Sequence, residues 1–332
     1  MILMKLIALL LVLCAMPVHC SSATLPPQFE KVRTVISDAI EDNAFPSAVV
    51  AVMQHNRVIF HEAFGQLTYD PSSPKTDTTT IYDLASVTKV LATTLSLMRL
   101  YDEGKINPDD PVIKFIPEFG VNGKERLTLR NLFLHNGGLV EFRKYIGTCK
   151  TPEAVMQAIY SDTLVYPTGT RTVYSDLDFI LLGEVIYRMT GKRLDRYFDE
   201  MFAKPLGLTS TFFCPPDAQL SRIAPTEADT NWHLPQKRPL VHDPNAALLQ
   251  GVAGHAGLFS TSGDILKVMK MVMAGGCANG KRFLKKETIR IFTTRDPVLG
   301  QRALGWDIKS GGEKASAGKY FSLKSYGHLG FT

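Results

Sequence analysis

The sequence is poor in cysteine and lacks the histidine spacings of metal sites. Its 332 residues include only five cysteines and eight histidines. The cysteines lie too far apart for a disulfide framework or a zinc site. The pair His61 and Glu62 lacks the second histidine of a zinc-binding helix. These absences argue against a metal-dependent hydrolase.

Long apolar runs and clusters of one charge are missing as well. The apolar stretch over residues 6–12 is too short to be a convincing membrane span. The 37 basic and 32 acidic residues give a formal net charge of +5, and the basic residues are scattered along the chain. We therefore expect a soluble globular protein that binds no nucleic acid.

Residues 1–23 have the pattern of an export signal. Lys5 supplies the positive charge at the start, residues 6–12 form the apolar region, and residues 21–23 are small enough for a signal peptidase. We expect cleavage at the end of this segment. The mature domain would then span residues 24–332, without a transmembrane anchor, and be periplasmic or secreted.

Removal of the signal would leave three cysteines, Cys149, Cys214 and Cys277. They allow one disulfide with one free thiol, but their wide spacing favours three buried thiols. The apolar fraction of 45% and the charged fraction of 21% are ordinary for a globular protein. The length fits one large domain or two lobes around a shared core.

The spacing of apolar residues predicts an α/β (α+β) fold. Helices are expected over residues 28–42, 86–104, 127–134, 178–189 and 264–273, and strands over 48–53, 58–64, 303–308 and 320–331. Strands near both ends predict one antiparallel sheet built from the N- and C-terminal segments. Helices would flank this sheet, and a large, mainly helical lobe would be inserted between its halves.

The most informative motif is Ser86-Val87-Thr88-Lys89. A serine and a lysine three residues apart lie on one face of a helix. A buried amine can take the proton of a neighbouring hydroxyl, which makes the serine a nucleophile. Two other Ser-x-x-Lys matches, at Ser72 and Ser316, lie among Pro, Gly and Ser residues. Only the first continues into an apolar segment, residues 90–100, that is typical of a core helix.

Two further segments place polar groups in unusual settings. Tyr174-Ser175-Asp176 precedes a predicted helix, and a tyrosine phenol near a lysine can relay protons. A helix-capping aromatic is the plainer interpretation of Tyr174 alone. His255 lies in the Gly-rich segment 251–257, whose backbone can approach a ligand closely. A tight turn with His255 bonded to a carbonyl is the structural alternative.

The last expected strand carries His328 and Gly330. A glycine on a strand leaves room for substrate beside the backbone. A single histidine on a strand is more often structural than catalytic. The order of the motifs changes this balance: Ser-x-x-Lys, then Tyr-Ser-Asp, then His-x-Gly on a late strand.

In this order the motifs resemble those of the serine β-lactamase and penicillin-binding-protein superfamily. The sequence is most similar to the class C β-lactamase-like branch, which includes D-Ala-D-Ala carboxypeptidases and related esterases. The similarity runs from about residue 29 to residue 332. Beyond the motifs it rests on the segments 127–139, 174–184, 223–227, 241–246 and 251–260.

The resemblance implies an acyl-enzyme mechanism with neither a metal nor an organic cofactor. Ser86 would attack a carbonyl, Lys89 would activate Ser86, and Tyr174 would shuttle protons. The backbone N–H groups of Ser86 and Phe331 would form an oxyanion hole. The implied substrate-binding and oxyanion residues are Asp176, His255, His328, Gly330 and Phe331.

Two residues depart from the family pattern. Asp176 stands where asparagine is common, which disfavours an anionic substrate carboxylate unless Asp176 is paired with Lys89 or protonated. His328 stands where many relatives have lysine, so a permanent positive charge is lost. Both departures point away from an efficient penicillin hydrolase and toward a peptidase or an esterase.

We therefore expect a small-molecule or peptidoglycan-derived substrate. D-alanyl peptides of the cell wall come first, followed by β-lactams and by small esters or amides. The alternative is an inactive pocket that binds peptidoglycan fragments or β-lactams without turnover. Relatives continue with further strands and a terminal helix, so an end at Thr332, beside an unprotected edge strand, predicts a chain truncated at its C-terminus.

Overall fold

The structure is a computed structural model that describes residues 29–226, 241–297, 302–309 and 320–332. The predicted export signal lies outside these residues. Within them, no helix combines the length and the apolar character needed to cross a membrane.

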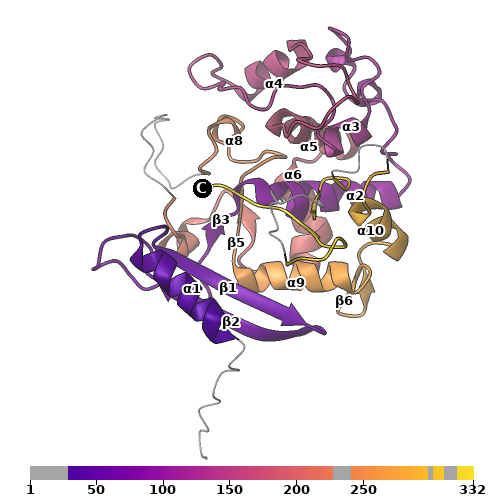
Figure 1. The fold of residues 1–332 in the computed structure, drawn as a ribbon. Helices are drawn as coiled ribbons and strands as arrows, with labels where there is room; N and C mark the ends of the chain where they lie inside the picture. Colours follow the sequence, from indigo (N-terminus) through magenta and orange to yellow (C-terminus); the bar gives the residue numbers. More distant parts are fainter. Residues whose placement is uncertain (1–28, 227–240, 298–301, 310–319) are drawn as a thin grey trace, which may run out of the picture.

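A helix and a hairpin form the N-terminal end of the molecule (Figure 1). Helix α1 (Glu30–Glu41) packs on strands β1 (Ser47–Gln54) and β2 (Arg57–Gly65). The strands pair antiparallel, and the turn residues His55 and Asn56 have φ values of 49° and 62°, as a two-residue hairpin turn requires. The predicted helix and hairpin are confirmed within two residues at each end.

A buried helical segment runs through the middle of the molecule. It consists of a 3₁₀ turn η2 (Ala85–Val87), a π-helical stretch η3 (Lys89–Thr94) and helix α2 (Leu95–Asp102). Every residue of η3 is buried, as the apolar sequence predicts. The π-helical geometry was not predicted. Such wide turns commonly occur at functional sites.

Three helices gather at the end of the molecule opposite the hairpin (Figure 1). They are α3 (Leu129–Phe133), α4 (Pro152–Ser161) and α5 (Asp176–Thr190). The helix predicted over residues 127–134 is confirmed as α3, which Thr128 begins because its hydroxyl accepts the N–H of Asn131. These helices form the expected mainly helical lobe.

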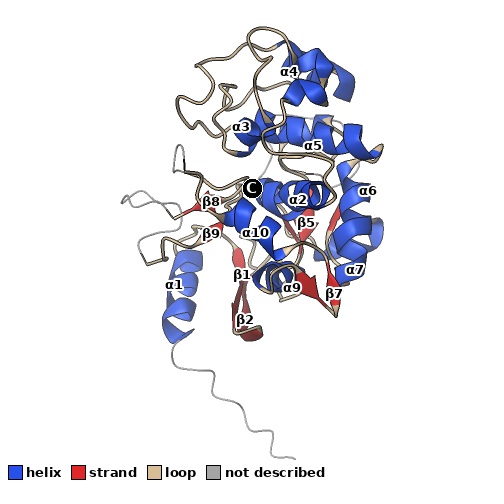
Figure 2. Ribbon diagram, turned by 90° about the vertical axis from the view of Figure 1, so that its right-hand side faces the viewer, coloured by secondary structure: helices blue, strands red, loops and turns tan. Residues whose placement is uncertain are grey.

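The remaining elements surround the buried helix (Figure 2). The short helical turns are η4 (Val112–Lys114), η5 (Pro117–Phe119), η6 (Asp199–Ala203) and η7 (Asp217–Arg222). The helices are α6 (Leu194–Phe198), α7 (Lys204–Leu206), α8 (Pro244–Leu248), α9 (Ser262–Met273) and α10 (Lys286–Thr293). The strands are β3 (Tyr82–Asp83), β4 (Phe212–Phe213), β5 (Leu258–Ser260), β6 (Cys277–Ala278), β7 (Lys281–Arg282), β8 (Asp307–Ile308) and β9 (Tyr326–Gly327).

The mixed α/β fold class is confirmed, although the strands pair differently from the expected single sheet. In the described part of the chain, β1 pairs with β2 and β8 pairs with β9 as separate ladders, and β5 lies between β3 and β4. The strand predicted over residues 303–308 shortens to β8. Its first half turns instead, because Gly305 has a φ of 85° and its N–H donates to the Phe133 carbonyl.

The three cysteines among the described residues, Cys149, Cys214 and Cys277, are free thiols, as the wide spacing favours. The expectation that all three are buried is wrong. Cys214 is exposed, and Cys149 and Cys277 are half-buried. Each lies on a short strand or in a loop near the surface, where a small apolar side chain is not covered by a second layer.

Candidate active site

Ser86 and Lys89 lie together at the start of the buried helix, as the motif predicts. The amine nitrogen of Lys89, Nζ, is 2.9 Å from Ser86 Oγ. The Lys89 side chain is completely buried, whereas Ser86 is half-buried. Nζ also donates to Asp176 Oδ1 at 2.7 Å and to the backbone carbonyl of His255 at 3.1 Å. Because a buried amine requires hydrogen-bond partners, these contacts hold Lys89 beside Ser86.

The turn that presents Ser86 is strained and is braced by Asp83. Ala85 has a φ of 43°, a left-handed conformation that is unusual for alanine. One carboxylate oxygen of Asp83 accepts the N–H of Ala85 at 2.8 Å, and the other accepts the N–H of His242 at 2.7 Å. Asp83 therefore ties the Ser86 turn to the segment before α8.

Tyr174 lies over Lys89, directly before α5. Lys89 Nζ is 4.8 Å from the centre of the Tyr174 ring, and the guanidinium carbon of Arg302 is 5.8 Å from it. Burial raises the pKa of Tyr174, while the charge of Lys89 and hydrogen bonding to Ser86 act in the opposite direction. With its pKa raised overall, the phenol keeps its proton at neutral pH.

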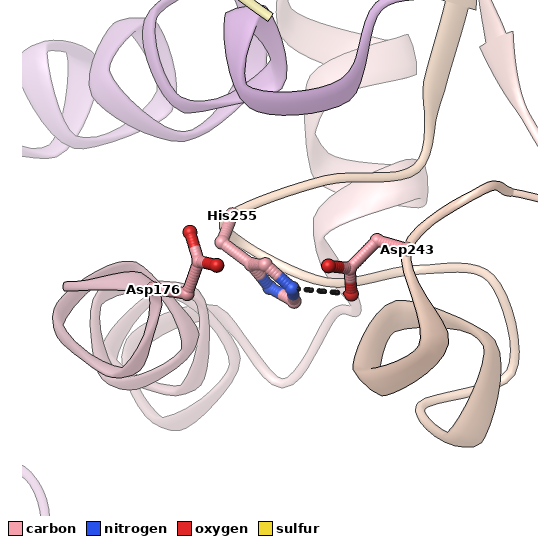
Figure 3. Close-up of side chains that lie close together, drawn as sticks. All are labelled: Asp176, Asp243 and His255. Atoms are coloured by element: carbon pink, nitrogen blue, oxygen red, sulfur yellow. Dashed lines mark hydrogen bonds and ion pairs between the residues drawn. The ribbon is translucent and has the colours of Figure 1, made fainter. Parts of the chain in front are cut away.

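Asp176, His255 and Asp243 lie side by side, with His255 between the two carboxyl groups (Figure 3). The His255 side chain is buried, and its Nε2 is 2.7 Å from Asp243 Oδ1. The same carboxylate oxygen accepts the N–H of Ala246 at 2.7 Å, at the start of α8. His255 thus contacts Lys89 through its backbone carbonyl, while its ring is bonded to a carboxylate. A tight turn in which the ring bonds a carbonyl, the structural alternative from the sequence, is not what the structure shows.

These three side chains also offer metal-ligand atoms within 4.8 Å of one another. Each of them already has a partner in the protein. Asp176 is paired with Lys89, and His255 is paired with Asp243. The amine of Lys89 occupies the position beside Asp176 that a metal cation would take. The geometry therefore identifies these side chains as the surroundings of Lys89 rather than as a metal site.

The C-terminal segment passes close to the Ser86 turn. A Cβ atom on Gly330 would lie 2.5 Å from the carbonyl oxygen of Leu84, so only glycine fits there. The prediction that Gly330 leaves room for substrate needs correction, because the Leu84 backbone occupies that space. The next residue, Phe331, is exposed, and its ring centre is 5.8 Å from that of His242.

His328 lies next to Tyr174, with 5.9 Å between the two ring centres. Its Nδ1 is 2.6 Å from the carbonyl oxygen of Leu329. Burial lowers the pKa of His328 to about 4. The ring is therefore neutral at pH 7 and does not replace the positive charge that a lysine would supply at this position.

Sequence reasoning missed four side chains that surround the candidate residues: His135, Asp178, Asp243 and Arg302. Three of them, His135, Asp178 and Asp243, lie in segments that carried the family resemblance, yet none was singled out as a site residue. Two of these carry a local signal: His135 follows the end of a helix, and Asp243 precedes a helix that begins with proline. Arg302 has no comparable motif. It is found only because folding places its guanidinium over Tyr174.

A hollow of about 510 Å³ lies between α4, α5 and residues 249–254. None of the eight candidate residues lines it. It reaches Gly254, and the neighbouring residue His255 is bonded to Lys89. Ser86, the candidate nucleophile, does not line this hollow.

Comparison with known proteins shows the family of this chain. A family model described as Beta-lactamase matches residues 32–332. The chain belongs to the beta-lactamase family. Members of this family and the relatives below are serine hydrolases, and the protein is an enzyme of that kind.

A relative from Escherichia coli (strain K12), named "Putative D-alanyl-D-alanine carboxypeptidase", is 34% identical over 329 residues, covering 88% of this chain and 75% of the relative. Among solved structures of the beta-lactamase and penicillin-binding-protein fold, a penicillin-binding protein homologue from Caulobacter crescentus has a TM-score of 0.73 at 24% identity. The match covers 92% of this chain and 86% of that one. EstCE1, a hydrolase with promiscuous acyltransferase activity, has a TM-score of 0.70 at 22% identity, covering 89% and 85%.

Proposed function

We propose that this serine hydrolase is of the D-Ala-D-Ala carboxypeptidase type and works through a Ser86 acyl-enzyme. The observation that carries the proposal is the three-way contact of Lys89 Nζ with Ser86 Oγ, Asp176 and the His255 carbonyl. Carboxylate and carbonyl oxygens only accept, so they take two hydrogens of Nζ. The remaining position faces Ser86 Oγ, and in the neutral amine it is a lone pair that can take the hydroxyl proton.

Acylation and deacylation then follow from these contacts. Ser86 Oγ bonds to the carbonyl carbon of the substrate peptide, and the hydroxyl proton passes to Lys89. The C–N bond breaks as a proton reaches the leaving amine through Tyr174. Water then cleaves the ester by the reverse proton route and frees Ser86.

The oxyanion of each step would be held by the backbone N–H groups of Ser86 and Phe331. The close approach of Gly330 to Leu84 supports this role, because it brings the two backbones together. Donors fixed where negative charge develops commonly contribute roughly 10²–10³-fold in rate.

The pairing of Asp176 with Lys89 supports a substrate that carries a carboxylate. The two side chains are 2.7 Å apart. A carboxylate whose oxygen accepts a hydrogen bond from a buried amine repels a second carboxylate less than a free one does, and the hydroxyl proton that Lys89 takes up during acylation strengthens this effect. A D-alanyl peptide therefore remains compatible with aspartate at this position.

The neutral state of His328 favours esters as a second candidate substrate class. With its pKa near 4, His328 offers no positive charge to a terminal carboxylate. An uncharged ester needs no such charge. The two classes are separated by comparing turnover of a D-alanyl-D-alanine peptide with that of a short-chain p-nitrophenyl ester.

The first experiment is intact mass spectrometry of the purified protein after exposure to a penicillin, with Ser86→Ala alongside. We expect a persistent adduct that depends on Ser86 and release of D-alanine from the peptide. Acylation of a folded Ser86→Ala variant would contradict the proposal. Saturable penicillin binding without an adduct or product would identify the binding-only alternative.

The proposal includes export and removal of residues 1–23, which leaves residues 24–332 as the hydrolase domain. The relatives named as D-alanyl-D-alanine carboxypeptidases support a location where the cell wall is accessible. N-terminal sequencing of the mature protein tests this point. A mature protein that still begins at Met1 would refute it.

A further inference from the structure

His135 is a buried histidine that the proposed steps leave unused. It follows α3 with a φ of 54°, in the left-handed position that usually carries glycine at the end of a helix. Its side chain is completely buried, and its ring centre is 4.6 Å from that of Tyr174. A histidine held in this conformation has a side-chain contact that glycine could not make.

Both chain neighbours of Tyr174 are bonded to His135. The N–H of Val173 donates to the His135 carbonyl at 2.8 Å, and the N–H of Ser175 donates to His135 Nδ1 at 3.1 Å. Asp178 Oδ2 lies 2.8 Å from the same ring nitrogen. The backbone on each side of Tyr174 is thus fixed to one residue, whose ring also packs against the phenol.

These contacts determine where the protons are. A backbone N–H can only donate, so Nδ1 accepts and the ring proton is on Nε2. Nδ1 has a single lone pair, so the protonated carboxyl group of Asp178 shares it with the Ser175 N–H in a three-centre contact. In agreement, burial lowers the pKa of His135 well below its usual range and raises that of Asp178 well above. The pair is neutral and adds no charge beside Tyr174.

We propose that His135, held by Asp178, is a positioning residue that sets the Tyr174 phenol against Lys89 and Ser86. The inference rests on the proposed function only for the part that Tyr174 takes in acylation. The contacts that place Tyr174 are independent of the substrate.

The groups that face His135 and Tyr174 come from several elements. They are Lys89 on η3, Asp176 and Asp178 on α5, Arg302 before β8, His328 after β9, and Tyr166, whose hydroxyl donates to the His135 carbonyl. All of these remain when His135 is replaced. A positioning role therefore predicts a lower rate with unchanged midpoints in the pH profile, whereas a proton-transfer role for His135 would remove or move a midpoint.

The test compares acylation of the full chain by a penicillin in three variants. In His135→Ala we expect the acylation rate constant to fall by about 10²-fold, as is typical when a catalytic group is misplaced by about 1 Å. The fraction of protein that can be acylated and the binding constant stay as in wild type. His135→Asn recovers most of the rate, because its Oδ1 can accept the Ser175 N–H and asparagine tolerates a positive φ.

The matched control is His61→Ala. His61 is a half-buried histidine on β2 whose Nε2 is 2.8 Å from Ser262 Oγ, in the hairpin region. We expect this variant to keep the wild-type rate. If His135→Ala does not fold, His135→Asn is compared with His135→Gln, whose longer side chain does not place its oxygen at the Nδ1 position.

Hydrogen exchange tests the placement of Tyr174 without any activity. The Ser175 amide should exchange faster in His135→Ala than in wild type, whereas the Val173 amide keeps its backbone acceptor and its protection. Unchanged Ser175 exchange, or a wild-type acylation rate in His135→Ala, would overturn the proposal. If the wild type forms neither an adduct nor an opened penicillin or released D-alanine, the proposed function fails, and the exchange result still decides the role of His135.

Discussion

Two histidine–aspartate pairs lie near Lys89 and combine the same residue types, yet the pKa of the carboxyl group is shifted in opposite directions in the two pairs. In the pair under Tyr174, His135 Nδ1 is 2.8 Å from Asp178; in the pair beside α8, His255 Nε2 is 2.7 Å from Asp243. Burial raises the pKa of Asp178 well above its usual range, whereas the pKa of Asp243 is lowered.

The surroundings of each carboxyl group explain this difference. Asp178 is completely buried, and the neighbouring charge of Asp176 raises its pKa further. Burial acts in the same direction on Asp243, but the charge and hydrogen bond of His255 and the N–H of Ala246 outweigh it. The contacts of His255 and the Ala246 N–H thus favour the ionised form of Asp243, whereas burial and the charge of Asp176 favour the neutral form of Asp178.

The largest effect is expected from breaking the pair beside α8. Asp243→Ala leaves the buried His255 ring without its partner and removes the N-terminal cap of α8. An unpaired buried group costs about 1–3 kcal/mol and a lost cap about 1 kcal/mol, so we expect a loss of about 3 kcal/mol in the free energy of unfolding. Urea denaturation measures it, and a loss below about 1 kcal/mol would show that the pair contributes little to stability.

Neutral amide substitutions sharpen the comparison. Asp243→Asn removes a charge-assisted hydrogen bond and should cost about 1.5–3 kcal/mol. Asp178→Asn replaces a neutral acid by a neutral amide that can still donate to His135 Nδ1, so the cost should stay below about 1 kcal/mol. Equal losses in the two variants, measured by urea denaturation, would mean that both carboxyl groups are charged.

The pH dependence of stability should differ in sign between the two pairs. The lowered pKa of Asp243 means that its contribution is present above the unfolded pKa of about 3.9 and is lost as pH falls through the folded value. The raised pKa of Asp178 means the reverse: its contribution is present below about 3.9 and is lost as pH rises through the folded value.

Denaturation of wild type and the two amide variants between pH 3 and pH 8 checks this prediction. The advantage of wild type over Asp243→Asn should grow as pH rises, and its advantage over Asp178→Asn should shrink. Curves that move in the same direction would contradict the assignment of one neutral and one charged pair.

The sequence predicts most of the helices and the residues of the central motif, but not the contacts that hold them. Local patterns suffice for α1, the hairpin and α5, because apolar spacing and turn residues act over a few positions. They also predict that Ser86 and Lys89 meet. The pairing of Lys89 with the His255 carbonyl joins residues 166 positions apart, and no local pattern encodes such a contact.

The same limit explains the corrections. The glycine-rich segment around His255 predicts a close approach of the backbone, and the structure shows one to the chain itself: a Cβ on Gly254 would lie 1.9 Å from the Phe179 carbonyl oxygen. Gly330 is explained in the same way by the Leu84 backbone. A glycine-rich segment signals a close approach, and only the fold shows whether the neighbour is a ligand or the chain itself.

The smallest effect on acylation is expected at Thr93. This substitution tests whether Lys89 is held by the backbone carbonyls of the loop or by the pairing of the His255 side chain with Asp243. Lys89 and Thr93 lie four residues apart and donate to consecutive carbonyls, those of His255 and Gly254, with Thr93 Oγ1 2.6 Å from the latter. Thr93→Val keeps the shape but leaves a buried carbonyl unpaired, at a cost of about 1 kcal/mol. If the His255–Asp243 pair holds the loop, acylation by penicillin should change by no more than a few fold. A much larger loss of the acylation rate would show that the carbonyls of the loop, and not the His255–Asp243 pair, position Lys89.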